Sequence, residues 1–208
     1  MTASLWINRV VRPLVIVAGI GPAIWLAIAF LHDDLGANPA EHLEHFTGTA
    51  ALVILLLSLS ITPLRRLVGI NPLIRLRKPI GLWSFAYACL HFSCYLVFDQ
   101  SLDLREILHD IAKRPYITVG FSAWLILLSL ATTSFAWAIR KLGGKRWNAL
   151  HRLVYVAAAA GVIHYLWSVK RDVSVPTALG IALIVLLAAR LERRPATGKP
   201  MLGVGESA

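Results

Sequence analysis

Three histidines lie inside long apolar stretches of this sequence, and their positions give the first indication of chemistry. They are His91, His151 and His164, whereas the other four histidines lie among or beside charged residues. An ionisable side chain at the depth of a lipid bilayer costs free energy, so such a residue is a functional hypothesis by default. Imidazoles at this depth ligate haem or another metal, or relay protons. The alternative is a neutral histidine that hydrogen-bonds to a neighbouring helix.

The apolar stretches themselves predict a membrane protein. Of the 208 residues, 57% are hydrophobic and only 15% are charged, and the mean hydropathy is +0.67. A soluble chain of this size could not bury so much apolar surface, which excludes a soluble globular enzyme, a disordered tail and a nucleic-acid-binding domain. Six stretches are long enough to cross a bilayer. They lie at about 13–31, 47–62, 79–98, 118–138, 150–168 and 175–190. We therefore predict an all-α integral membrane protein, with a six-transmembrane-helix bundle over residues 1–194 and a flexible tail over 195–208.

Charged residues alternate between the connecting segments and predict the orientation of the bundle. The chain carries 21 Lys and Arg against 11 Asp and Glu, a formal net charge of +10. Sixteen of the 21 basic residues lie on one side of the predicted membrane, and nine of the 11 acids lie on the other. Basic segments face the cytoplasm, so both termini are predicted to be cytoplasmic. This distribution explains the positive charge without a nucleic-acid partner.

His91 and His164 are predicted to lie at the same depth. The stretches 79–98 and 150–168 both run outward from the cytoplasm and are therefore parallel. At a rise of 1.5 Å per residue, His91 lies about 12 Å and His164 about 9 Å from the outer edge. Two imidazoles at matching depth can hold a haem iron from both sides. Such an iron has no free position for a substrate, which suits electron transfer.

His151 lies apart from this pair. It is about 20 Å closer to the cytoplasm than His164, and 13 residues of ideal helix leave the two side chains roughly 140° apart. A second haem held by two histidines is not predicted at this level, because the chain at the start of the third stretch offers Arg77 and Lys78 there but no histidine. Two interpretations remain open. His151 is a haem or flavin ligand or a quinone hydrogen-bond donor, or it is an interfacial histidine packed beside Trp147.

Basic residues near the level of His151 suit an anionic partner. Arg77, Lys78 and Arg152 are candidates for contacts with haem propionates, a flavin phosphate or a quinone. The alternative is that these basic residues only mark the cytoplasmic side of the membrane. The sequence has no Gly-rich dinucleotide-binding loop, so NAD(P)H is not expected to bind in the usual way. Electrons are expected to arrive from a quinone or from another protein.

The outer segment 32–46 contains acidic residues but no Lys or Arg. Its run Glu41-His42-Leu43-Glu44-His45 has a helical spacing that suits a metal ion, but it matches neither H-E-x-x-H nor the inverse motif. We interpret the segment as a solvated, acidic surface on which a partner docks.

Four segments, taken in chain order, resemble a known family. They are Thr47-Gly48 with Thr62-Pro63-Leu64-Arg65-Arg66; Arg77-Lys78-x-x-Gly81-Leu82 leading to Tyr87-Ala88-x-x-His91; Lys113-Arg114-Pro115-Tyr116-Ile117-Thr118-Val119-Gly120; and Trp147-Asn148-x-Leu150-His151-Arg152-Leu153-x-Tyr155 running to His164-Tyr165-x-Trp167. Together they are similar to the haem-binding membrane subunits of bacterial periplasmic methionine-sulfoxide reductase systems, the MsrQ family. That family is a short bacterial branch of the ferric-reductase-like transmembrane group.

The resemblance implies an electron-transfer subunit of the bacterial inner membrane rather than the catalytic subunit. It implies b-type haem, with the family's histidines at His91, His151 and His164, and it implies FMN. Electrons would come from the quinone pool or from a cytoplasmic flavin reductase. They would go to a periplasmic molybdenum-containing reductase that repairs oxidised methionines. The wider group usually has two histidines on each ligand helix, whereas the third stretch here supplies one.

Two other functions compete with this interpretation. The first is a cytochrome b subunit of another membrane oxidoreductase or of a metal reductase, from which only the bound partner would distinguish it. The second is a proton channel or transporter that uses the histidines as relays. Such proteins carry Asp or Glu within their spans. None of the six predicted stretches contains an acid, which argues against the second alternative.

Overall fold

The computed structural model describes residues 2–191, and this part of the chain is helical and contains no strand. Six helical segments are long and apolar enough to cross a membrane, which confirms the predicted all-α, six-helix, multi-pass fold. They run Ala3–Leu31, Pro39–Val68, Asn71–Asp99, Pro115–Thr132, Ala136–Ser168 and Ser174–Leu191. The predicted tail, 195–208, lies outside the described residues.

Several of these segments are divided into shorter helices. The elements in chain order are α1 (Ala3–Trp6), η1 (Ile7–Val11), α2 (Arg12–Ala18), α3 (Gly21–Leu31), α4 (Pro39–Val68), η2 (Asn71–Leu76), α5 (Arg77–Cys94), η3 (Tyr95–Asp99), α6 (Leu104–Lys113), α7 (Pro115–Thr132), α8 (Ala136–His151), α9 (Val154–Ser168) and α10 (Ser174–Leu191).

Local sequence signals determine where key helices begin and end. The side-chain oxygen of Asn38 caps α4 by accepting a hydrogen bond from the Glu41 backbone N–H at 3.3 Å. The same helix ends at Gly69, whose φ of 72° is the left-handed conformation that glycine adopts without strain. Asp103 caps α6, and Pro115 occupies the first turn of α7.

The helices extend beyond the apolar stretches. Helix α4 begins eight residues before the predicted stretch 47–62 and ends six residues after it, because the backbone stays helical through charged positions that end an apolar run. The connecting segments 99–117 and 139–152 also contain helix, in α6 and in much of α8. Gly143, at a φ of 73°, interrupts α8 with a kink. The N-terminal turns of α4 and the whole of α6 therefore belong to the framework that positions the site.

Helix α4 forms the centre of the core. Its buried residues Leu52, Leu55, Leu56 and Leu59 pack against α7, α9 and α10. On α9 the contact is made by small side chains, Ala157 and Ala158 among them. Small residues allow membrane helices to approach closely, since lipid offers no hydrophobic driving force between helices. The close approach of α9 to α4 and to α7 brings polar atoms within bonding distance, and the Thr49 hydroxyl on α4 donates to the Tyr165 hydroxyl on α9 at 3.1 Å.

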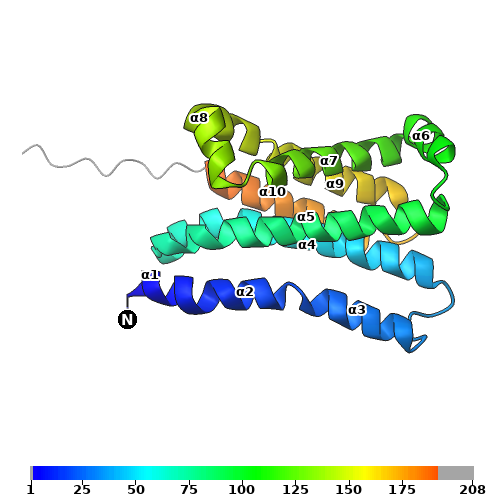
Figure 1. Ribbon diagram of the computed structural model, residues 1–208, viewed down its shortest axis with the longest axis horizontal. Coiled ribbons are helices and arrows are strands. Elements are labelled where there is room, and N and C mark those ends of the chain that lie inside the picture. The colour runs from blue at the N-terminus through cyan, green and yellow to red at the C-terminus, as the bar shows by residue number, and fades with distance from the viewer. Residues whose placement is uncertain (1, 192–208) are drawn as a thin grey trace, which may run out of the picture.

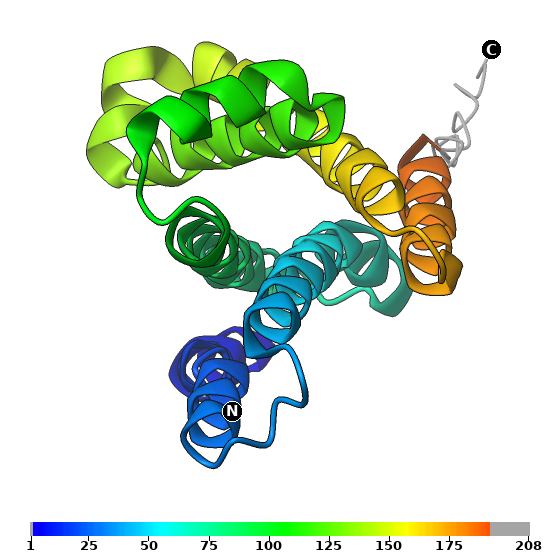
Figure 2. The same cartoon turned by 90° about the vertical axis from the view of Figure 1, so that its right-hand side faces the viewer.

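The first span lies at one edge of the bundle and α10 at another (Figure 2). Tyr87 on α5 is completely buried and donates a hydrogen bond from its hydroxyl to the Gly19 carbonyl at 2.9 Å. A Cβ at Gly19 would come within 2.2 Å of the Trp83 ring, so glycine is needed for this contact. The first span thus attaches to α5, while α4, α5, α7 and α9 surround the interior.

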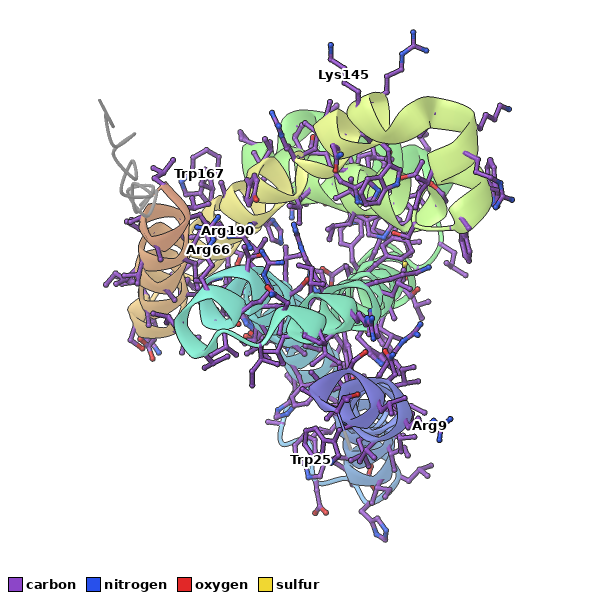
Figure 3. The ribbon with its side chains drawn as sticks, turned by 90° about the vertical axis from the view of Figure 1, so that its left-hand side faces the viewer. Arg9, Trp25, Arg66, Lys145, Trp167 and Arg190 are labelled. Atoms are coloured by element: carbon purple, nitrogen blue, oxygen red, sulfur yellow. The ribbon has the colours of Figure 1, made fainter. Side chains whose placement is uncertain are left out.

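The two ends of the bundle differ in charge. The N-terminus, the end of α4, helix α8 and the last turns of α10 gather at one end, and α6 lies at the other (Figure 1). Seen from the first end, Arg9, Arg66, Lys145 and Arg190 lie on four different elements (Figure 3). We call this the basic end and the opposite one the acidic end, where Asp33, Asp34 and Glu41 are exposed.

Candidate functional site

A cavity of about 300 Å³ lies between α4, α5, α7 and α9 toward the acidic end. His91 from α5 and His164 from α9 both line it. Their ring centroids are 5.9 Å apart, and the ring planes are inclined at 69°. The structure thus brings together the two histidines that the sequence places at matching depth.

Backbone carbonyls orient both imidazoles. His91 Nδ1 lies 3.0 Å from the Glu44 carbonyl oxygen, and His164 Nδ1 lies 2.8 Å from the Tyr116 carbonyl oxygen. A carbonyl only accepts hydrogen bonds, so each Nδ1 carries the proton and each neutral ring keeps a free lone pair on Nε2. Histidines that bind metals are commonly held in this way by an outer hydrogen bond.

A glycine follows each of these carbonyls by one helical turn and leaves the carbonyl oxygen accessible to the imidazole. Gly48 follows Glu44 by four residues, and Gly120 follows Tyr116 by four. A side chain on a helix covers the turn that precedes it, so a Cβ at these glycines would lie over the two carbonyls. It would come within 3.1 Å of the His91 ring and within 2.6 Å of the His164 ring. Glycine is therefore what lets the imidazoles reach the backbone.

The separation of the rings suits one metal centre between them. Metal–nitrogen bonds of about 2.0–2.1 Å to two opposed imidazoles would put the ring centroids about 6 Å apart. The remaining wall of the cavity is largely apolar, and one part of it is an aromatic cluster. Phe92 and Trp124 have ring centroids 4.9 Å apart, and Phe121 stacks on Trp124 at 13°. The Trp124 Nε1–H is buried and has no hydrogen-bond partner among the described residues. These features fit a large, flat, mostly apolar group with a metal at its centre.

The outer rim of the cavity carries acidic side chains. Glu44 and Asp99 both line it, and one Glu44 oxygen is buried without a hydrogen-bond partner among the described residues. The interpretation of 32–46 as a solvated surface is therefore wrong for Glu44, because the helical period of α4 turns that residue inward with Gly48. Glu41 and His42 stay exposed. In the described part of the chain, no three His, Cys, Asp or Glu side chains converge as a metal-binding group would.

A second cavity of about 690 Å³ lies toward the basic end. His151, Arg77, Lys78 and Arg152 line it, so the structure separates His151 from the histidine pair and gathers it with the basic candidates. The Arg77 carbonyl accepts a hydrogen bond from Ser58 at 3.1 Å, and the Lys78 ammonium lies 5.4 Å from the Phe135 ring centroid.

His151 has contacts of a different kind from those of the pair. Its ring stacks on Trp147, with centroids 3.9 Å apart and planes 25° apart. The Thr133 hydroxyl donates to the Ser129 carbonyl at 2.6 Å and therefore accepts from His151 Nε2 at 3.2 Å. Trp147 Nε1 donates to the Thr133 carbonyl at 2.8 Å. In His151 the free lone pair is thus on Nδ1, the reverse of His91 and His164.

An arginine that the sequence analysis did not single out supports the second cavity. Arg190 on α10 is partly buried, and its guanidinium donates to the Tyr155 hydroxyl and the Leu59 carbonyl. Arg66 donates to the Arg190 carbonyl at 3.3 Å, and the two arginines lie close together in Figure 3. Tyr155 lines the second cavity, so the Arg190 guanidinium contacts the wall of that cavity through the Tyr155 hydroxyl.

Comparison with known proteins decides the family. The family described as "Ferric reductase like transmembrane component" matches residues 47–162. A protein of Herminiimonas arsenicoxydans is 48% identical over 183 residues, which cover 87% of this chain and 84% of the relative. A protein of Rhodospirillum rubrum is 47% identical over 184 residues and 88% of each chain. Both are named "Protein-methionine-sulfoxide reductase heme-binding subunit MsrQ".

The chain belongs to the MsrQ family. The resemblance seen in its sequence is thereby confirmed. The ferric-reductase-like match includes His91, His151 and both glycines that contact the paired imidazoles, and His164 follows two residues after it. Gly48 and Gly120 belong to the sequence motifs of this family, but the motifs alone assign them no role. A glycine within an otherwise apolar membrane helix was the available signal.

Proposed function

We propose that this chain is a transmembrane electron-transfer subunit that binds haem b and serves a methionine-sulfoxide reductase catalytic subunit in the repair of oxidised proteins. The names of the relatives support both the cofactor and the partner. We further propose that His91 and His164 hold the haem iron.

The 5.9 Å separation of the two imidazoles carries the proposal. Each ring is fixed by a backbone carbonyl and keeps Nε2 for a metal. When bound, haem supplies one-electron chemistry that no side chain of this cavity supplies. The residues of the chain do the rest: the carbonyls orient the ligands, and Phe92, Phe121 and Trp124 keep water away. Held by His91 and His164 together, the iron would have no place for a substrate, which favours electron transfer over catalysis.

We propose that the protein lies in the bacterial inner membrane with its basic end and both termini in the cytoplasm. The charge distribution supports this orientation. The cavity at the basic end then opens toward the electron donor, which is the quinone pool or a cytoplasmic flavin donor. Arg77, Lys78 and Arg152 suit a propionate, a quinone oxygen or the phosphate of FMN, a cofactor that only the family resemblance supports.

The acidic end faces the periplasm in this orientation. There we propose that a molybdenum-containing catalytic subunit docks and receives electrons. The exposed carboxylates of Asp33, Asp34 and Glu41 support an approach guided by charge. The outer cavity lies near this end, which shortens the distance to a docked partner.

Removal of either proposed ligand tests the haem site. We expect His91→Ala or His164→Ala to abolish the low-spin absorption spectrum, oxidised and dithionite-reduced, because one axial ligand is lost. Added imidazole is expected to restore part of the low-spin spectrum in a variant that retains haem. His42→Ala, at an exposed position of α4, is the matched control. Full haem content and unchanged spectra in both cavity variants would show that the iron is held elsewhere.

The two glycines give a graded test of ligand orientation. We expect Gly120→Ala to lose most of its haem absorbance, because a Cβ 2.6 Å from His164 Nδ1 forces the ring from its carbonyl. Gly48→Ala should lose less, since its Cβ lies 3.1 Å from the His91 ring. Gly21→Ala should behave as wild type, because a Cβ there meets nothing within 4 Å. The measurement is haem per protein after purification, and an equal haem content in all three variants would contradict the geometry.

Replacement of His151 tests electron entry at the second cavity separately from haem binding at the outer cavity. We expect His151→Ala to slow haem reduction by a quinol or a reduced flavin while the low-spin spectrum of the outer haem is retained, because His151 lines the other cavity. Stopped-flow reduction measures the rate, with His42→Ala again as control. An unchanged rate of haem reduction, or loss of the low-spin spectrum, would refute this role.

The exposed acids test the docking surface. We expect the combined variant Asp33→Asn, Asp34→Asn and Glu41→Gln to slow electron transfer to the catalytic subunit by about tenfold at low ionic strength, since steering by surface charge has this size and is screened by salt. Asn is chosen at position 33 because Asp33 has a φ of 57°, which Asn tolerates. Stopped-flow reoxidation of the reduced protein measures the rate.

The control is a triple variant at the basic end, Arg140→Gln, Lys141→Gln and Lys145→Gln. Equal rates for the acidic variant and wild type at low salt would place docking elsewhere.

A further inference from the structure

Asp110 is a buried carboxylate that neither the sequence analysis nor the proposed electron path uses. It lies in the last turn of α6, and only 7% of its surface is exposed. Helix α6 packs through Ile107 and Asp110, whereas Leu104 and Leu108 are exposed. A buried anion is costly unless it is paired and hydrogen-bonded, so the partners of Asp110 explain why it is tolerated.

Three donors from three different places in the chain meet on this carboxylate. The Tyr95 hydroxyl and Gln100 Nε2 donate to Oδ2 at 3.2 Å and 3.0 Å. Arg114 Nε donates to Oδ1 at 2.7 Å. Tyr95 begins η3, Gln100 follows it, and Arg114 precedes α7. Asp110 therefore joins the outer end of the α5–η3 segment to the start of α7.

Both ends of this link lead to a proposed haem ligand. Tyr95 follows His91 by four residues, about one helical turn, and lines the same cavity. On the other side, Arg114 Nη1 donates to the Tyr116 hydroxyl at 3.3 Å, and the Tyr116 carbonyl accepts from His164 Nδ1 at 2.8 Å. The carboxylate thus touches neither imidazole, but it joins the segment that carries His91 to the start of the helix whose Tyr116 carbonyl orients His164.

The attachment of α6 itself has other support. Asp103 caps the helix by accepting from the backbone N–H groups of Arg105 and Glu106 at 2.9 Å and 3.3 Å. The Thr118 hydroxyl donates to the Ile111 carbonyl, which ties α6 to α7. Because Asp103 caps the start of α6 and Thr118 ties its end to α7 without Asp110, the three bonds to that carboxylate act mainly on the elements that donate them.

We propose that Asp110 is a positioning residue that fixes the relative orientation of His91 and His164 by linking η3 to the start of α7. The proposal rests on the proposed function, because that function makes these two histidines the haem ligands. It adds a residue outside the cavity that controls the geometry of the ligands and, through its charge, the reduction potential of the iron.

The test compares Asp110→Ala, Asp110→Asn and the control Asp103→Ala in the purified, haem-loaded protein. The low-spin EPR g values report the angle between the two imidazole planes, haem transfer to apomyoglobin reports how firmly the haem is held, and redox titration gives the potential. We expect Asp110→Ala to show a second low-spin species and about tenfold faster haem loss, which corresponds to losing charged hydrogen bonds. We also expect its potential to rise, because an anion that favours the oxidised iron is removed.

The conservative variant separates position from charge. Asp110→Asn keeps an oxygen that accepts from Tyr95 and Gln100, so its g values should stay close to those of wild type while its potential rises. Asp103→Ala removes the cap of α6 and should leave both the g values and the potential unchanged. If Asp110→Ala does not fold, Tyr95→Phe, which removes one donor, should give the same second species in smaller amount.

Unchanged g values and haem loss in Asp110→Ala would overturn the proposal, as would a change of equal size in Asp103→Ala. A wild-type protein that binds no haem would instead contradict the proposed function. The two failures are therefore distinguishable in one set of samples.

Discussion

Every polar group that lies within lipid must find its partner inside the protein, and this constraint governs how the bundle holds its two imidazoles. Both rings satisfy it through the backbone: His91 bonds to the Glu44 carbonyl and His164 to the Tyr116 carbonyl. A carbonyl cannot change rotamer, so the rings are oriented by the helices themselves. Because Glu44 and Tyr116 lie near the starts of α4 and α7, the ring orientation depends on where those two helices begin. The cap at Asn38 and the proline at the first position of α7, Pro115, therefore belong to the functional framework as much as the histidines do.

The same constraint explains why glycine recurs one turn after each carbonyl. A helical carbonyl at position i already accepts from the N–H of residue i+4, and the side chain of that residue covers it. With Gly48 and Gly120 at those positions, the carbonyl oxygen is left open for a second donor from a neighbouring helix. The small side chains of α9 act in the same direction, since they let α9 approach α4 and α7 closely enough for His164 to reach across. Close helix packing and the orientation of the two imidazoles therefore both depend on small residues at the helix contacts.

The sequence predicts the parts of this arrangement that depend on one helix at a time. Apolar length predicts the six spans, and the rise per residue predicts that His91 and His164 share a depth, since both follow from local geometry. The sequence does not predict which face of α4 turns inward, and it therefore favours a solvated surface for Glu44 although this residue lines the cavity. The bonds from the two histidines to the Glu44 and Tyr116 carbonyls, the contact between His151 and Thr133 and the three donors on Asp110 escape prediction for the same reason. Each joins residues from different helices, and single-span periodicity carries no information about helix-to-helix register.

The charges that remain near the two cavities have opposite signs, which bears on the direction of electron transfer. At the basic end, Arg190 has only a hydroxyl and a carbonyl as side-chain hydrogen-bond partners among the described residues, so its positive charge is not neutralised by a contacting acid. At the acidic end, Glu44 and Asp99 line the other cavity. Positive charge around a cofactor stabilises an added electron and therefore favours the reduced form. Negative charge destabilises the added electron and favours the oxidised form. In the proposed orientation, an electron is therefore taken up readily at the cytoplasmic cavity and given up readily at the periplasmic one. In the proposed electron route, the step between the cavities rises in electrostatic energy, so the proposed partner would have to drive it by being the stronger oxidant.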